Sequence, residues 1–579
     1  MKSFLKIFSI LTRKQMRICA FLIVLMFIIA AFEALGVGLL YPLITIIGDE
    51  NWLEKHEKIA RLIAIFGINT HRKLIFFASM SLLMFYFIKN FIILLQGKLQ
   101  INFSLNNQRD YSKRLYAYYM RKPYLYHLDV NIAVISRNIS SGGSTIFSEI
   151  LISMLQIITN LITVVVIWGF ICAIDWLIAV GVAFVMGPLV FGLLNYFRKK
   201  ITKAGDIQNK CNAKNGKWIN QGFYSLKETK VMQCEDFFIR EFDNSYSAFV
   251  DSNKDYLFVQ RFPKSIIEIV TIGGILLLIA IKMLFNSNPA SLIPTLGVLA
   301  LAAVRLMPSL NQTINLFNSI KFRLPIFNEM YDDLLAVRNN KDLDERKLLQ
   351  SSCTALPFKN EISVKNLAFA YPSKEKNVFE NVSFTIPKGS FVGIVGPSGA
   401  GKTTFVDILL GLLPPKSGTI TVDGTDIFSN LHGWLDNIAY VPQSIYLIDG
   451  SIKANISFGI ADEEVDDEKI EKVLRMAELY DFVQTLPEKE NTSAGDRGAK
   501  LSGGQKQRIG IARALYHDPA VLILDEATSA LDNETEKQIT DTILKLKGQI
   551  TIIAIAHRLS TLENCDFKIK FDNGSAEIL

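Results

Sequence analysis

A glycine-rich loop has the residue types and spacing needed to hold a triphosphate. Gly396, Gly401, Lys402 and Thr403 fit the pattern GxxxxGK[ST], after an apolar run at 391–395 and before a helical pattern. Glycines let backbone N–H groups close around phosphates, and the positive end of the helix dipole adds to the attraction. We therefore expect Lys402 to reach the β- and γ-phosphates and the Thr403 hydroxyl to bind Mg²⁺. The alternative is a glycine-rich turn without a ligand, and the complete motif in its required context disfavours it.

An acidic pair ends a second apolar run, AVLILDEA at 520–527. A buried strand there would deliver Asp525 to the metal ion, and the adjacent Glu526 could polarise an attacking water as a general base. The alternative for such a pair is a helix cap at a strand end. Together with the glycine-rich loop, the pair indicates hydrolysis of a nucleoside triphosphate.

A third motif, LSGGQKQR at 501–508, carries a family resemblance. It is similar to the signature of ATP-binding-cassette (ABC) ATPases, and the resemblance covers residues 361 to about 560. It implies an α/β P-loop nucleotide-binding domain that takes ATP and Mg²⁺. In the glycine-rich loop, the implied ATP-binding residues are Gly396, Pro397, Ser398, Gly399, Ala400, Gly401, Lys402, Thr403 and Thr404.

The resemblance also assigns single residues elsewhere in the cassette. Tyr371, in FAYP, is similar to the aromatic residue that stacks on adenine. Gln443, in YVPQ, resembles the Q-loop residue that contacts Mg²⁺ and couples to the membrane domain. His557, in AIAHRLS, resembles the switch histidine that contacts the γ-phosphate. The implied catalytic residues are Glu526 and His557, and the implied metal ligands are Thr403, Gln443 and Asp525.

The signature motif has a consequence for assembly. GDRGAKLSGGQ matches the exporter X-loop and signature, with Asp496 where glutamate is commoner, and SALD at 529–532 resembles the D-loop. In this family the nucleotide lies between the glycine-rich loop of one cassette and the signature of another. The signature residues here are Ser502, Gly503, Gly504 and Gln505. The chain has one cassette, so the resemblance implies a C2 homodimer, with a heterodimer as the alternative.

Hydrophobic residues are concentrated in the first half of the chain. They make up 50% of the 579 residues, and a membrane span needs about 20 apolar residues. The long loops after the second and fourth spans are rich in Lys and Arg. Positive-inside logic therefore places these loops, both termini and the nucleotide-binding domain in the cytoplasm. The six candidate spans are roughly 18–47, 74–97, 146–173, 176–197, 262–285 and 291–317.

Composition argues against several other classes of protein. The net charge of +7 is modest and reflects the basic loops, so nucleic acid is not an expected partner. The six cysteines are scattered without a CxxC, which argues against a disulfide framework or a cysteine metal site. Between the first two spans, residues 51–69 fit either an amphipathic helix on the outer leaflet or a plain loop.

The periodicity changes after the sixth span. Short β-branched runs alternate with helical patterns, which is typical of a mainly parallel sheet with helices on its faces. The runs predicted as strands are EISVKNLAFAY, VSFTI, SFVGIVG, IAYVPQ, AVLILDEA and ITIIAIAH. The predicted fold is a membrane all-α six-helix transmembrane domain plus an α/β P-loop ABC nucleotide-binding domain. We expect a transmembrane domain with two cytoplasmic coupling loops at 1–320, a linker at 321–357 and the nucleotide-binding domain at 358–579.

Six helices before one cassette resemble an exporter-type (type IV) ABC half-transporter. Its coupling helices would correspond to residues 120–129 and 221–242. The second of these segments, together with FEALGVGLLYPLI (32–44), FPKSIIE (262–268) and LAAVRLMPSLNQ (301–312), resembles bacterial lipid-linked oligosaccharide flippases. The resemblance implies ATP-driven flipping of a polyprenyl-pyrophosphate oligosaccharide across a bacterial inner membrane. Export of another lipid, a drug or a peptide is the alternative within the class. An ABC-gated channel is a third possibility, whereas a soluble ABC ATPase conflicts with the six spans.

Charged residues inside apolar runs are costly and usually functional. Glu33, Lys89, Glu268 and Arg305 fall within such runs. Arg305 lies about four turns into its helix, and an arginine lining a cavity could hold a pyrophosphate through paired hydrogen bonds. The alternatives are an ion pair with Glu33 or Glu268, or a side chain that reaches back to the membrane surface. Arg305 is therefore a candidate residue of the substrate cavity.

Overall fold

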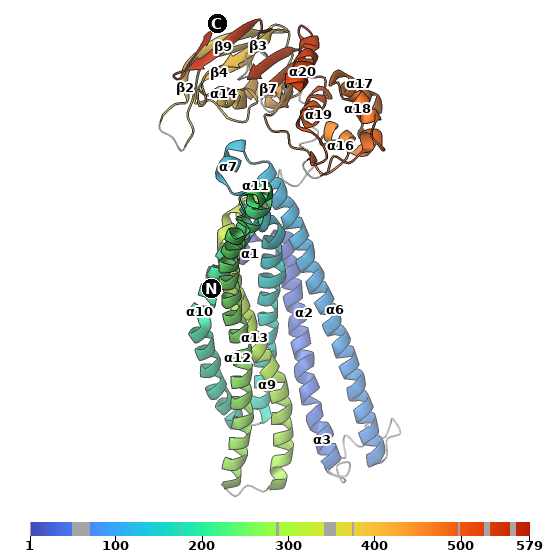
Figure 1. Ribbon diagram of the computed structural model, residues 1–579. Helices are drawn as coiled ribbons and strands as arrows, with labels where there is room; N and C mark the ends of the chain where they lie inside the picture. Colours follow the sequence, from blue (N-terminus) through green and yellow to red (C-terminus); the bar gives the residue numbers. More distant parts are fainter. Residues whose placement is uncertain are drawn as a thin grey trace. The chain divides into compact units, whose positions relative to one another are not determined.

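The chain folds into two compact units in the computed structural model (Figure 1). The structure describes residues 2–48, 70–174, 176–284, 289–340, 355–372, 376–495, 498–525, 533–555 and 563–579. Unit 1 comprises Met1–Lys122 and Asp129–Glu345. Unit 2 comprises Pro123–Leu128, most of the short helix α7 (Tyr124–Asp129), and Arg346–Leu579.

Unit 1 is helical throughout its described part. It contains α1 (Lys2–Ile10), α2 (Arg13–Gly38), α3 (Leu40–Gly48), α6 (His71–Met120), α8 (Ile132–Arg137), α9 (Ile152–Ile174), α10 (Trp176–Tyr224), α11 (Leu226–Val231), α12 (Glu235–Leu284) and α13 (Pro289–Asn339). Two π-helical segments, η1 (Asn138–Gly142) and η2 (Ser144–Leu151), lead into α9. The first span is divided at Leu39, because Pro42 has no backbone N–H and cannot donate the helical hydrogen bond to the carbonyl of Gly38.

Each of the six predicted spans falls within these helices. Among the described residues, three stretches are long and apolar enough to cross a membrane: Arg13–Glu33, His71–Met120 and Ile132–Gly169. The other three predicted spans lie in α10, α12 and α13. Since α6 has 50 residues, it is about 75 Å long at 1.5 Å per residue, more than twice the thickness of the hydrocarbon core. The helix α6 is therefore longer than a membrane span requires.

The long helices α10, α12 and α13 pack together outside the predicted spans. The rings of Tyr256 and Phe322 stack with their centroids 3.9 Å apart, and Val259 is buried beside them. The Ser252 hydroxyl donates a 2.7 Å hydrogen bond to the backbone carbonyl of Ala204. These contacts stabilise the helical extensions where no lipid surrounds them.

Unit 2 contains two sheets. The four-stranded sheet has the order β2-β1-β4-β5, and the six-stranded sheet has the order β10-β9-β3-β8-β7-β6. The strands are β1 (Glu361–Phe369), β2 (Phe379–Pro387), β3 (Phe391–Val395), β4 (Ser417–Val422), β5 (Thr425–Asp426), β6 (Ile438–Val441), β7 (Val521–Asp525), β8 (Thr551–Ile555), β9 (Phe567–Asp572) and β10 (Ser575–Ile578). The helices are α14 (Lys402–Leu409), α15 (Leu431–Leu435), α16 (Ile452–Ile456), α17 (Asp467–Met476), α18 (Tyr480–Gln484), α19 (Gly503–Leu515) and α20 (Asn533–Leu546).

The six-stranded sheet buries side chains on both faces, because successive residues of a strand point to opposite sides. On β3, Val392 and Ile394 join a core with α14 and the four-stranded sheet. Phe391 instead joins a core with α17, α19 and α20. On β7, Ile523 joins the first core and Leu522 the second. The sheet is therefore a rigid, doubly covered platform for the loops at its ends.

The sequence predicted β1, β2, β3, β6, β7 and β8, and the structure confirms them. It missed β4, β5, β9 and β10. The segment predicted as a linker, 321–357, begins inside α13, which continues to Asn339. Residues 51–69, for which a helix and a loop were both open, lie outside the described residues.

Candidate functional site

Parallel strands bring the predicted nucleotide-binding segments to one edge of the six-stranded sheet. β3, β8, β7 and β6 are neighbours in that order, and all run parallel. Their carboxyl ends lie level, since Ile394 and Asp525 both pair with Ile555. Ligands of open α/β sheets bind at this edge. The glycine-rich loop follows β3, Asp525 ends β7 and Gln443 follows β6, so the topology gathers these segments in one place.

The glycine-rich loop closes around its own lysine. Lys402 is the first residue of α14, and its side chain is only 6% exposed. Its Nζ donates hydrogen bonds to the carbonyl oxygens of Gly396 (2.8 Å) and Pro397 (3.0 Å). The ammonium therefore lies over the loop at a helix N-terminus, where phosphate oxygens are favoured. Thr403, the next residue, is exposed.

A tyrosine on the neighbouring strand holds Asp525. The carboxylate is 7% exposed, and the Tyr440 hydroxyl donates a 3.2 Å hydrogen bond to its Oδ2. Tyr440 pairs with Ile523 across β6 and β7, so it shares a face with Asp525, one diagonal position away. Burial, and then the Asp525 charge, raise the pKa of Tyr440 far above its usual value. Tyr440 is therefore a neutral donor at every physiological pH.

A second carboxylate shares this environment. Burial, and then the charge of Asp525, raise the pKa of Asp407 on α14 to about 6. In the described part of the chain, no group of three or more His, Cys, Asp or Glu side chains could hold a metal ion. Mg²⁺ instead takes one or two carboxylates together with substrate phosphates and hydroxyl oxygens. The carboxylate of Asp525 and the hydroxyl of Thr403 have the donor chemistry that fits such an ion.

Tyr371 lies beside the start of α14. Its hydroxyl and the Thr404 Oγ1 are 3.2 Å apart, within hydrogen-bond distance. Its ring also makes an edge contact with Phe369, with the centroids 5.0 Å apart. The side chain is half-buried, so part of the ring stays accessible. The structure thus brings the residue predicted to stack on adenine next to the predicted phosphate loop.

The signature motif forms the start of α19. The Ser502 Oγ accepts a hydrogen bond from the Gln505 backbone N–H (3.3 Å), and the Gln505 Oε1 accepts one from the Ser502 N–H (2.9 Å). This is a reciprocal capping box. Ser502 and Gly503 are exposed, as is Gln443. The capped helix end therefore presents its first turn at the surface.

Several predicted site residues lie outside the described residues. They are Glu526, the segment 529–532, His557 and Asp496. Arg305 belongs to α13, but its side chain is also outside the described part. Their roles stay predictions.

Sequence reasoning missed two residues beside Asp525, namely Tyr440 and Asp407. The sequence shows Tyr440 only as part of an apolar run before VPQ, and the pairing of β6 with β7 that brings it to Asp525 cannot be read from that run. Asp407 gave no signal, since an acidic residue in a short helix is ordinarily solvated.

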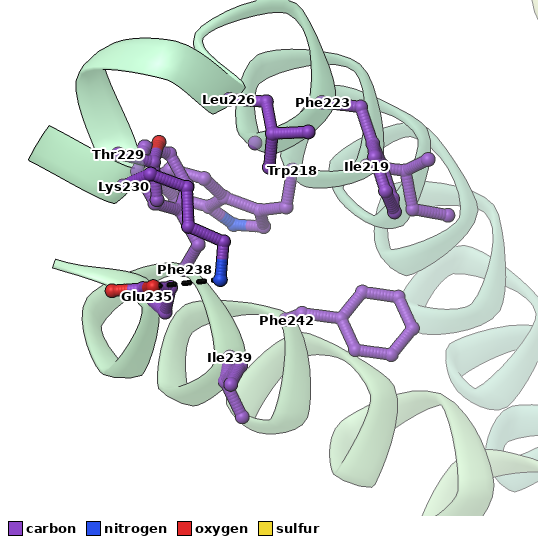
Figure 2. Close-up of a pocket in the computed structure, with 11 residues that line it drawn as sticks. Trp218, Ile219, Phe223, Leu226, Thr229, Lys230, Glu235, Phe238, Ile239 and Phe242 are labelled. Carbon is purple, nitrogen blue, oxygen red and sulfur yellow. Dashed lines mark hydrogen bonds and ion pairs between the residues drawn. The ribbon is translucent and has the colours of Figure 1, made fainter. Parts of the chain in front are cut away.

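A separate apolar pocket lies where α10, α11 and α12 meet (Figure 2). It has a volume of about 390 Å³, and Trp218 and Phe242 are among the side chains that line it. Lys230 and Glu235, two of its few polar residues, form an ion pair at 2.9 Å. The sequence marks residues 221–242 as a polar coupling segment, whereas the folded segment presents a mainly apolar hollow. The reason is that α12 contributes Phe238 and Phe242, and α11 contributes Leu226, to the side of the hollow that faces α10.

Comparison with known proteins agrees with this architecture. Residues 16–289 match the ABC transporter transmembrane region, and residues 379–529 match the ABC transporter family. The ATP-dependent lipid A-core flippase of Saccharophagus degradans is 31% identical over 454 residues, which are 77% of this chain and 72% of that protein. The chain belongs to the ABC transporter family. This exporter-type half-transporter hydrolyses ATP and couples the reaction to transport across a membrane.

Two further comparisons show how much of the chain resembles other ABC transporters. ABC transporter B family member 22 of Arabidopsis thaliana is 43% identical over 219 residues, which are 38% of this transporter but only 18% of the plant protein. A solved structure of a bacterial Atm1-family ABC exporter with ATP bound has a TM-score of 0.74 and covers 98% of this chain and 96% of its own. Its sequence identity of 21% supports the fold alone.

Proposed function

We propose that this transporter flips a polyprenyl-pyrophosphate-linked oligosaccharide across the bacterial inner membrane. One observation carries the proposal: a relative that matches 454 residues, or 77% of the chain, is a lipid A-core flippase. The segments at 32–44, 262–268 and 301–312 add the resemblance to lipid-linked oligosaccharide flippases. Plant and fungal ABC transporters match over only 38% and 37% of the chain and do not bear on a lipid cargo.

ATP would bind at the carboxyl edge of the six-stranded sheet. Lys402 exchanges its two carbonyl partners for phosphate oxygens, and Tyr371 stacks on the adenine. Thr403, Asp525 and Gln443 would hold Mg²⁺, which neutralises charge on the phosphates. Glu526 would orient the attacking water and His557 would contact the γ-phosphate. The Tyr440 hydroxyl keeps the carboxylate of Asp525 in place.

Two copies of the chain would complete the sites. The exposed first turn of α19, with Ser502 and Gly503, suits presentation to the nucleotide of a second cassette. Closure of the cassettes would reach the membrane helices through residues 120–129 and 221–242. Purification through a tag on one copy should recover a second, differently tagged copy. Crosslinking that captures only complexes with a different chain would contradict the homodimer.

Cargo recognition can be tested by ATPase stimulation in nanodiscs. We expect a short polyprenyl-pyrophosphate oligosaccharide to raise the ATPase rate, and a phospholipid of similar length to leave it unchanged. If Arg305 holds the pyrophosphate, Arg305→Ala loses the stimulation. Unchanged flipping by that variant would remove Arg305 from the cargo site. Stimulation by unrelated drugs or lipids, without a response to the oligosaccharide, would favour the alternative exporter function.

A further inference from the structure

A polar pocket lies among α6, α9 and α13 of unit 1. It has a volume of about 600 Å³, and eight of its twelve lining residues are polar. We call it the amide pocket after its carboxamide side chains. Those used in the argument are Gln96, Gln100, Gln156, Asn160 and Gln312.

Measured against the predicted spans, the amide pocket reaches from the middle of the bilayer to the end of the second span. Its α6 wall begins near the end of the predicted span 74–97, and Gln312 lies near the end of the span 291–317. Asn160 lies inside the span 146–173. Basic residues follow the α6 wall, so positive-inside logic places this end of the second span in the cytoplasmic leaflet. Polar side chains at such a depth are unfavourable unless they have partners, and therefore call for an explanation.

A second pocket between the helices of unit 1 is lined mainly by apolar residues, so polar lining is not a common feature of this helical unit. It has a volume of about 390 Å³ and lies among α9, α10, α12 and α13. Val164, Leu306 and Leu310 are among its mainly apolar lining residues. Val164 is one helical turn from Asn160, so the lining changes from apolar to amide within one turn of α9.

The amides of the pocket keep unused hydrogen-bonding capacity. The Gln96 Nε2 donates to the Gln100 Oε1 at 3.1 Å, and the Asn160 Nδ2 donates to the Gln312 Oε1 at 3.3 Å. A carboxamide offers two donors and two acceptor lone pairs, so each of these bonds occupies only part of either partner. Gln100 is 6% exposed, and its Nε2 has no hydrogen-bond partner within the described part of the chain.

We propose that the amide pocket binds the sugar hydroxyls of the cargo while the lipid stays in the cytoplasmic leaflet. The inference rests on the proposed function and names the recognition site for its glycan. Vicinal hydroxyls each need a donor and an acceptor at short range, and carboxamides supply both without charge. Arg305 precedes Gln312 by seven residues, about two helical turns or 10 Å along α13. The backbone positions of Arg305 and Gln312 are therefore about two turns apart on α13.

The test compares two probes on the full chain in nanodiscs. One probe is farnesyl diphosphate, and the other is farnesyl diphosphate carrying a neutral trisaccharide of hexoses or N-acetylhexosamines. The variant is Asn160→Leu with Gln312→Leu, which removes both partners of one hydrogen bond and so leaves neither amide unpaired. Gln156→Leu is a second, single change. Asn106→Leu is the matched control, because Asn106 is an exposed amide on α6 outside the pocket.

We expect the wild type to bind a glycan probe at least tenfold more tightly than farnesyl diphosphate. The double variant should lose about tenfold of that preference and keep its affinity for farnesyl diphosphate, which shows that it is folded. Gln156→Leu should lose part of the preference, and Asn106→Leu none. A wild-type preference that both pocket variants retain overturns the amide pocket and leaves the proposed function standing. A wild type without any glycan preference overturns both.

Discussion

Two glycines of the phosphate loop respond very differently to the same added methyl group. Gly396 has φ +146°, and a Cβ there would collide with the backbone carbonyl oxygen of Phe571. Phe571 is fully buried in β9, within the core beneath α14, so its carbonyl has little freedom to move. Gly399 has φ +81°, and a Cβ there meets nothing within 4 Å. Gly396→Ala and Gly399→Ala therefore separate backbone strain from steric collision in one loop.

The structure indicates how much each substitution should lower the free energy of unfolding. Gly399→Ala carries only the strain of a left-handed conformation, about 1 kcal/mol. Gly396→Ala combines a conformation open almost only to glycine with displacement of a buried strand, at least about 3 kcal/mol. For a domain of this size, each kcal/mol shifts the melting temperature by about 2–4 °C. We expect a fall of about 2–4 °C for Gly399→Ala and at least about 6 °C for Gly396→Ala.

The assay is thermal unfolding of the full chain in detergent without nucleotide, followed through the transition of the nucleotide-binding domain. Wild type and both variants are measured at the same protein concentration and heating rate, because large proteins often unfold irreversibly. Equal shifts for the two variants would refute the collision with Phe571. A larger shift for Gly399→Ala would refute the loop geometry as a whole.

Two further predictions concern the carboxylates at the sheet edge. Asp407 has its pKa raised from 3.8 to about 6, so the stability that it contributes falls as the pH rises through that range. Asp407→Asn should therefore stabilise the nucleotide-free protein above pH 6 by about 1 kcal/mol, after allowance for partial solvent exposure, with the gain vanishing near pH 4. A gain in stability of Asp407→Asn that does not change with pH would contradict the raised pKa of Asp407. Tyr440→Phe removes the donor to Asp525, so ATP binding in the presence of Mg²⁺ should weaken about tenfold and binding without Mg²⁺ should not change. Titrations with a fluorescent nucleotide measure the dissociation constants with and without Mg²⁺. An equal loss of affinity without Mg²⁺ would argue that Tyr440 has a merely structural role.

The sequence signals of the predicted nucleotide site are local. Gly396 to Thr403 carry the loop in eight consecutive residues, and the strand ending at Asp525 is uniformly apolar. The parallel order of β3, β8, β7 and β6 then brings these segments together, as the alternation of strands and helices implied.

What the sequence missed depends on pairing between distant segments. β9, FKIKFD, alternates apolar residues with lysines as a half-buried strand does. Its place beside β3, with Ile569 and Phe571 fully buried, follows only from strand pairing. The Tyr440 bond to Asp525 requires the register of β6 on β7. The amide pocket draws on α6, α9 and α13, and in each helix the amides are interspersed with apolar residues. No short window of sequence contains these sites.

The measurement that tests the central claim most directly is ATP-dependent translocation in proteoliposomes. The substrate is a fluorescent polyprenyl-pyrophosphate oligosaccharide, and Glu526→Gln is the control because it removes the predicted general base. We expect the wild type to move the glycolipid only with ATP and Mg²⁺, and the variant to move none. Robust ATPase activity by the wild type without translocation would contradict the proposed cargo, and translocation by Glu526→Gln would contradict its coupling to ATP hydrolysis.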